Sequence, residues 1–248
     1  ALVVYDTGCE LARALAEAYR RNLPDASYFS TSKGTPLNSF ETSVRLRFAY
    51  LEKFLENSFY RTSLGSPLPI VEVKYTKGVS GILNSSYDYH RISGSVSDYQ
   101  DIAPLGSFYY NVFAGRTFGT IPYMFLDVAP GNEIYYYNKY AFNMMNRYEY
   151  IHDRYAGINV EHNFGNGLFR FIPLTRKLKF RQFWTAKAMW GSLSAENKAL
   201  NFVGSYPFKS LDGKTYLELG TGVDNIFKVL RLDFIWRALP QQTVKDKS

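Results

Sequence analysis

Alternation of side chains with a period of two residues is the feature that most constrains the fold of this chain. The clearest example is the segment 229–237. Its apolar face holds Leu230, Leu232, Phe234 and Trp236, and its polar face holds Arg231, Asp233 and Arg237. This period is typical of a β-strand that has one apolar and one polar side. The class of protein then depends on which solvent each side meets.

About eight segments with this alternation lie between residues 41 and 239. They fall near 43–50, 71–76, 87–96, 107–119, 156–164, 179–191, 216–225 and 229–237. Several approach the ~9–11 residues that a tilted membrane strand needs, whereas no run reaches the ~18 apolar residues of a membrane helix. Aromatic residues are 17% of the 248, and only alternate residues of a membrane barrel meet lipid. The sequence therefore predicts an all-β antiparallel fold of about eight strands. A transmembrane-type β-barrel portion and a soluble barrel both fit this alternation, and the family resemblance given below favours the transmembrane-type barrel.

The first thirty residues follow a different pattern. An apolar run at 1–5 precedes helix-spaced residues at 10–22, and Pro24 follows them. We therefore divide the chain into a short strand–turn–helix segment at 1–30, foreign or fused to the rest, a linker at 31–40, a β-barrel domain at 41–239 and a polar tail at 240–248. Residues 120–152 lack clean alternation and predict a large loop or mixed segment. No signal peptide opens the sequence, so the barrel interpretation implies a mature or truncated product.

The barrel hypothesis assigns a direction to each face. The lumen-facing candidates are Arg45, Arg47, Glu72, Lys74, Glu161, Arg181, Lys187, Glu218, Asp224, Arg231, Asp233 and Arg237. The lipid-facing or girdle candidates are Val44, Leu46, Phe48, Tyr50, Trp184, Trp190, Leu230, Leu232, Phe234 and Trp236. Mixed charges in the lumen predict a cross-braced, mostly filled interior. The net charge of +7 leaves a passage for anionic solutes as the alternative.

Catalytic signals are weak. Asp88 and His90 would share a strand face and could act as a base and its orienter for a nearby serine. Asp6-Thr7-Gly8 resembles one aspartic-protease loop, but such enzymes need two, and the same turn lacks the glycines of a nucleotide-binding motif. Cys9 is the only cysteine, and three histidines at these spacings predict no metal site. No basic cluster coincides with a nucleic-acid-binding motif.

Longer motifs carry a family resemblance. They are Phe40–Tyr50, Phe59–Gly65, Pro69–Gly78, Tyr137–Met145, Asp153–Ala156, Glu218–Lys228 and Leu232–Arg237. In this order they resemble a family of Gram-negative outer-membrane proteins of unassigned function. Full-length members of that family carry an N-terminal carboxypeptidase-regulatory-like domain before a large membrane β-barrel. The resemblance implies that this chain is the C-terminal portion of such a barrel.

The expected function follows from that resemblance. It implies a structural or transport-type protein of the outer membrane, with outer-membrane lipid and the barrel-insertion machinery as partners. It implies no nucleic acid, no cofactor and no catalytic residue. Two alternatives stay open, a soluble ligand-binding β-barrel with its apolar faces inward, and a barrel hydrolase that uses Asp88 and His90.

Overall fold

The computed structural model describes residues 38–132, 137–165, 167, 169, 180–201 and 209–240. The strand–turn–helix segment expected at 1–30 lies outside these residues, as do most of the linker at 31–40 and most of the tail at 240–248. The statements about structure below concern the described residues. Within them, no helix is long and apolar enough to cross a membrane.

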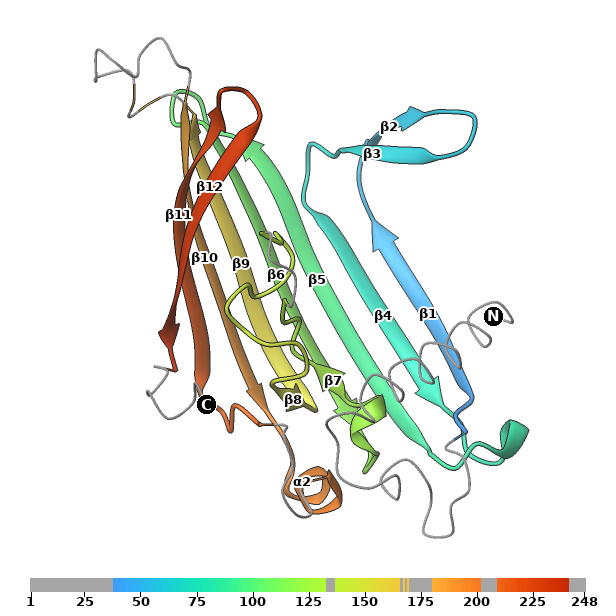
Figure 1. Cartoon of the computed structure of the whole chain (residues 1–248). Coiled ribbons are helices and arrows are strands. Elements are labelled where there is room, and N and C mark those ends of the chain that lie inside the picture. The colour runs from blue at the N-terminus through green and yellow to red at the C-terminus, as the bar shows by residue number, and fades with distance from the viewer. Residues whose placement is uncertain are drawn as a thin grey trace.

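Eight antiparallel strands form one large sheet, which confirms the expected all-β class. The strands are β1 (Glu41–Phe48), β4 (Ile70–Gly78), β5 (Tyr89–Asp101), β6 (Ser107–Phe118), β9 (Arg154–Gly165), β10 (Arg181–Ser192), β11 (Thr215–Ile226) and β12 (Leu230–Leu239). Each strand pairs with its neighbours in the order β1-β4-β5-β6-β9-β10-β11-β12. Figure 1 shows a strongly twisted, curved sheet in which β1 and β12 are the two edges. Within the described residues the sheet is therefore open.

Shorter elements are inserted between the long strands. A hairpin of β2 (Lys53–Glu56) and β3 (Arg61–Gly65) precedes β4, and η2 (Ile82–Asn84) precedes β5. Between β6 and β9 lie η3 (Tyr123–Phe125), β7 (Asp127–Val128) and β8 (Ile151–His152), and α2 (Ala195–Asn201) follows β10. Neither the hairpin nor α2 is predicted by the sequence pattern, because each is too short to show a clear period. The missing alternation at 120–152 did predict a mixed segment there.

The residues between β6 and β9, at 119–132 and 137–153, lie against one face of the sheet, and we call them the covering connection. Phe142 and Met145 of this connection form a buried cluster with Met189 of β10 and Tyr216 of β11. A second buried cluster joins Ile121, Leu126 and Ile151 to Tyr89 of β5 and to Leu193. The hydrophobic core therefore sits between the sheet and its own connection.

Burial along the strands is the inverse of that in a soluble sheet. On β11 the side chains of Tyr216, Glu218 and Asp224 are buried, whereas Leu217 and Leu219 are half-exposed. We call the side that carries Glu218 the covered face. The opposite side is the bare face, which exposes Val44, Leu46, Phe48, Ile92, Ile158, Trp184, Trp190, Leu232, Phe234 and Trp236.

Four glycines on the covered face are each paired with an aromatic residue on the neighbouring strand, whereas Gly220 is opposite Thr185. The pairs are Gly78 with Tyr89, Gly115 with Tyr155, Gly157 with Phe113, and Gly222 with Phe183. A Cβ at any of these glycines would lie 2.3–2.5 Å from its partner's ring. The rings therefore occupy the space above the glycine backbone, an arrangement that lets the sheet curve and fills gaps at the glycines.

Candidate functional site

A row of polar side chains crosses the covered face from strand to strand. Its members are successive cross-strand partners, namely Ser97, Asn111, Asn159, Lys187, Glu218 and Arg237. Lys187 is 3% exposed and Glu218 is 1% exposed. A charge this deep in a protein needs a partner, because burial without one costs several kcal/mol.

The covering connection supplies those partners through its backbone. The Glu218 carboxylate accepts hydrogen bonds from the backbone N–H of Asn143 at 2.8 Å and of Met144 at 2.7 Å, and from the Tyr216 hydroxyl at 2.6 Å. Lys187 Nζ donates to the carbonyl oxygens of Asn138 at 2.7 Å and of Ala141 at 2.6 Å. These two adjacent charges therefore fix residues 138–144 against the sheet.

Arg237 holds the end of the same connection. Its guanidinium donates to the Glu149 carboxylate at 3.0 Å and to the Tyr150 hydroxyl at 2.5 Å. It also lies 4.7 Å from the centre of the Tyr216 ring. Both ends of residues 138–150 are thus attached to β10, β11 and β12 by charged side chains.

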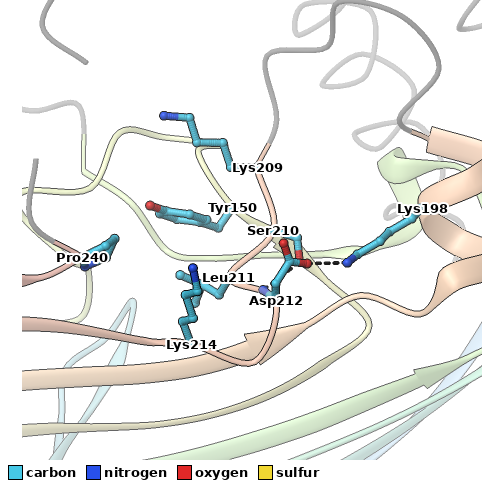
Figure 2. Close-up of a pocket in the computed structure, with 8 residues that line it drawn as sticks. All are labelled: Tyr150, Lys198, Lys209, Ser210, Leu211, Asp212, Lys214 and Pro240. Carbon is cyan, nitrogen blue, oxygen red and sulfur yellow. Dashed lines mark hydrogen bonds and ion pairs between the residues drawn. The ribbon is translucent and has the colours of Figure 1, made fainter. Parts of the chain in front are cut away.

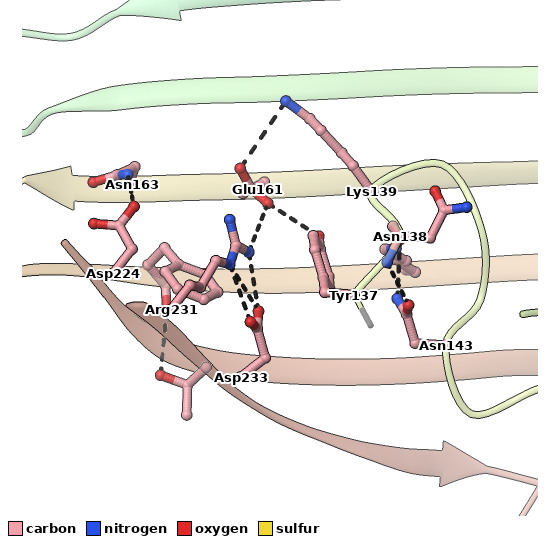
Figure 3. A network of polar contacts seen from close by, with 12 residues as sticks. Tyr137, Asn138, Lys139, Asn143, Glu161, Asn163, Asp224, Arg231 and Asp233 are labelled. Carbon is pink, nitrogen blue, oxygen red and sulfur yellow. Dashed lines mark hydrogen bonds and ion pairs between the residues drawn. The ribbon is translucent and has the colours of Figure 1, made fainter. Parts of the chain in front are cut away.

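Figure 3 shows a second network, centred on Glu161 of β9. The Glu161 carboxylate accepts a hydrogen bond from the Tyr137 hydroxyl at 3.0 Å and forms ion pairs with Arg231 at 3.5 Å and Lys139 at 4.0 Å. Arg231 also pairs with Asp233 at 3.0 Å. Burial, followed by the nearby Glu161 charge, raises the pKa of Tyr137, and burial lowers the pKa of Lys139. Tyr137 therefore stays neutral and acts as a hydrogen-bond donor.

The structure divides the twelve lumen-facing candidates into two groups. Those on β9 to β12 meet one another or the covering connection, including Arg181, which pairs with Asp224 at 2.8 Å. The candidates on β1 and β4 lie away from the connection. There Arg47 pairs with Glu52 at 2.5 Å and with Glu72 at 3.3 Å, while Arg45 is exposed and Lys74 half-buried.

In the part of the chain that the structure describes, large side chains on the bare face are exposed. Along β10 this face carries Gln182, Trp184, Ala186, Ala188, Trp190 and Ser192. Trp184 is 54% exposed and Trp190 is 39% exposed. Along β10 the bare face therefore carries polar side chains at both ends, a tryptophan next to each end and small side chains in the middle.

Asp88 and His90 lie on this bare face near one end of the sheet, with Lys77 between them. Lys77 Nζ donates to the Asp88 carboxylate at 2.5 Å and contacts His90 Nε2 at 2.9 Å. The Tyr75 hydroxyl is 2.6 Å from His90 Nδ1. Both ring nitrogens of His90 are therefore occupied, and the geometry does not form a base oriented by Asp88 for a serine.

Figure 2 shows a cavity at the end of the sheet where β12 ends. Its volume is about 480 Å³, and its walls are Tyr150, Lys198, Lys209, Ser210, Leu211, Asp212, Lys214 and Pro240. Lys198 forms an ion pair with Asp212 and donates a hydrogen bond to its carboxylate. This hydrogen bond lowers the pKa of Asp212. Three lysines against one aspartate leave the cavity cationic.

Alternation did not reveal the residues that cover the polar face. Tyr137, Lys139, Asn143 and Glu149 lie in a segment without regular alternation, where the tyrosines at 135–137 and the family motif Tyr137–Met145 were the available signals. Among the described residues, no group of three or more His, Cys, Asp or Glu side chains could hold a metal ion.

This fold and this site define an all-β protein of inverted polarity, with charges under cover and large apolar side chains bare. The chain belongs to a family of unknown function (DUF5686), since residues 7–196 match the C-terminal domain of that family. The match includes residues 7–30, which the sequence analysis had set apart from the family. Comparisons with curated proteins and with solved structures give no match.

Proposed function

We propose that the sheet is part of a transmembrane β-barrel in the outer membrane of a Gram-negative bacterium. The single observation that carries this proposal is the inverted burial of the strands. A soluble monomer rarely exposes a large contiguous apolar surface, yet the bare face presents Leu46, Ile158, Leu232 and Trp236 to the exterior. Lipid is the solvent that makes such a face favourable, while charges are directed to the interior.

The outward side of β10 supports the same proposal at the scale of one strand. Transmembrane barrels carry an apolar band that is flanked by aromatic girdles at both interfaces. Trp184 and Trp190 stand at the two ends of such a band, with Ala186 and Ala188 between them. In water, this placement of the two tryptophans around small apolar residues would not stabilise the strand.

The edges of the sheet argue for further strands. Unpaired backbone groups at a sheet edge are costly in lipid, so membrane-spanning strands close into barrels. In this proposal further strands pair with the edges β1 and β12 and complete a barrel. Outer-membrane lipid surrounds that barrel, and the barrel-insertion machinery is its assembly partner. An N-terminal carboxypeptidase-regulatory-like domain would then be anchored by the barrel.

The covered face favours a structural or anchoring role over an open channel. Lys187, Glu218 and Arg237 hold the covering connection against the inner side of β10 to β12. A passage for anionic solutes would run along the less covered side, beside Arg45 and Lys74. The soluble ligand-binding barrel needs its apolar faces inward, opposite to the exposure of Trp184 and Trp236, and the occupied His90 nitrogens give no support to the hydrolase.

A set of arginine substitutions on one side of β10 tests the proposal. Ala188→Arg lies in the middle of the band, whereas Gln182→Arg and Ser192→Arg lie at its two ends. Insertion into lipid predicts a loss of about 2–4 kcal/mol of stability in the middle and about 0–1 kcal/mol at the ends. Folding into lipid vesicles, measured by urea titration, gives these values. Equal and small effects at all three sites, with recovery of the protein in the soluble fraction without detergent, would overturn it.

A further inference from the structure

Two arginines stand directly opposite each other on the bare face. Arg116 of β6 and Arg154 of β9 are cross-strand partners, and both are exposed. Like charges in this position repel and destabilise a sheet, because directly opposite Cβ atoms are only about 5 Å apart. The pair therefore destabilises the sheet locally, and the pairing of β6 with β9 does not depend on it.

The surrounding residues compensate this repulsion poorly. No ion pair of Arg116 is recorded among the described residues, and its guanidinium lies 4.4 Å from the centre of the Phe118 ring. Arg154 forms an ion pair with Oδ1 of its chain neighbour Asp153 at 3.7 Å, while Oδ2 of the same carboxylate accepts from Asn197 and Ser194. One carboxylate thus stands against two guanidinium groups, and their remaining positive charge can hold an anion.

The position of the pair indicates which anion it meets. One row of cross-strand partners nearer the middle of the sheet contains Ala114, Ala156 and Trp190. Beyond these lie the exposed apolar residues Val112 and Ile158. The pair therefore lies where the apolar face ends, beside an aromatic residue of the kind that occupies a membrane–water interface.

We propose that Arg116 and Arg154 form a clamp for the phosphate of an anionic lipid headgroup. This inference rests on the proposed membrane function. Guanidinium groups bind phosphate oxygens in a bidentate manner, and one phosphate between the two arginines neutralises their repulsion. The acyl chains of the same lipid then lie along Ala114, Ile158 and Trp190. A soluble phosphate would gain no such apolar contact, so the clamp selects a lipid.

Quenching of Trp190 by brominated lipids tests the clamp. The full chain with Trp184→Phe and Trp236→Phe retains Trp190 as its single tryptophan, and it is placed in vesicles of phosphatidylcholine mixed with phosphatidylglycerol. One or the other lipid is brominated in its chains, and the ratio of quenching gives the relative affinity near Trp190. We expect a preference for phosphatidylglycerol of roughly three- to ten-fold. It should fall to about one in the Arg116→Gln/Arg154→Gln variant.

Two further variants make the result specific. Lys53→Gln/Lys228→Gln removes two positive charges from exposed positions outside the clamp, and the preference should persist. Arg116→Lys/Arg154→Lys keeps the charge but loses the bidentate geometry, so an intermediate preference is expected. This variant also controls for folding, because its charge balance is unchanged.

The outcomes separate the two proposals. A preference that survives Arg116→Gln/Arg154→Gln overturns the clamp and leaves the membrane function standing. Saturable stabilisation by inorganic phosphate in neutral detergent, without a lipid preference, also overturns it. If neither brominated lipid quenches Trp190 at all, the bare face does not meet lipid, and the proposed function itself fails.

Discussion

The covered and bare faces of the sheet differ in the kind of side chain that each one buries or exposes. On β11, Glu218 is almost completely buried, while its chain neighbour Leu219 is half-exposed. On β10 the same contrast separates Lys187 from Trp184. Each pair differs in sequence position by one or three residues, so the strand pleat alone places its members on opposite sides.

This contrast shows that polar contacts join apolar packing in holding the covered face. Within the described residues, hydrogen bonds and ion pairs attach the covering connection to the sheet beside the two buried clusters around Phe142 and Tyr89. The bare face contributes little to folding in water, because its large side chains stay exposed. Substitutions on the two faces should therefore have effects opposite to those in a soluble protein.

The largest effect is expected from Glu218→Ala. It removes the acceptor of two backbone N–H groups and of the Tyr216 hydroxyl, and it removes the carboxylate that is the cross-strand partner of buried Lys187. Breaking buried charged contacts of this kind costs about 3–5 kcal/mol. Chemical unfolding in detergent measures it.

The matched substitution on the bare face is Leu232→Ala. Leu232 is exposed on β12, so its loss should cost about 1 kcal/mol or less. A larger loss at Leu232 than at Glu218 would reverse the comparison and indicate an ordinary apolar core.

Acid should weaken the covered side through His152. Burial lowers the pKa of His152 to about 4, and its ring lies 4.8 Å from that of Tyr155. The unfolded chain binds this proton near pH 6.5, so its contribution to stability is complete above that pH. It is lost as the pH falls toward 4, by up to about 3 kcal/mol.

Unfolding titrations between pH 7.5 and 4 measure this loss. Burial raises the pKa of Asp127, which acts in the opposite direction and reduces the net slope. His152→Gln should flatten the profile. An unaltered slope in His152→Gln would contradict the assignment.

A smaller effect is expected from one added methyl group. Gly157→Ala on the covered face places a Cβ 2.4 Å from the Phe113 ring and 3.0 Å from the Ala188 carbonyl oxygen. Overpacking of this kind costs about 1–3 kcal/mol. Gly94→Ala on the bare face meets its nearest atom at 3.4 Å and should be close to neutral. Equal losses at both positions would show that the aromatic–glycine pairs do not shape the sheet.

The smallest expected effect is a gain in stability. Arg116→Gln relieves the repulsion from Arg154, so in neutral detergent it should stabilise the sheet by a few tenths of a kcal/mol. Thermal unfolding with and without an anionic detergent measures the change. A clear destabilisation in neutral detergent would mean that Arg116 has a structural partner inside the protein.

A feature of this fold could be predicted from the sequence when the residues that form it are close together in the chain. Alternation at 216–225 and 229–237 predicts β11 and β12 together with the face of each side chain, because the pleat is local. The hydrogen bonds from Asn143 and Met144 to Glu218 join residues 75 and 74 positions apart. No local pattern encodes such a contact.

The expected pairing of Asp88 with His90 illustrates the same limit. Their shared face was predictable from their spacing, but the position of Lys77 depends on the register between β4 and β5, in which Lys77 faces His90. The short β2–β3 hairpin and α2 escaped prediction because four to seven residues carry too little periodicity.

The sequence by itself determined that this protein is built from long antiparallel strands with one polar and one apolar side. Its family resemblance suggested which side should meet lipid. The tertiary structure decided that the covering connection contacts the sheet from β5 to β12, that Lys187 and Glu218 hold one part of it, and that Arg116 lies opposite Arg154. The physical reason is that alternation sets the direction of a side chain within its strand, whereas strand register and chain return set what that side chain meets.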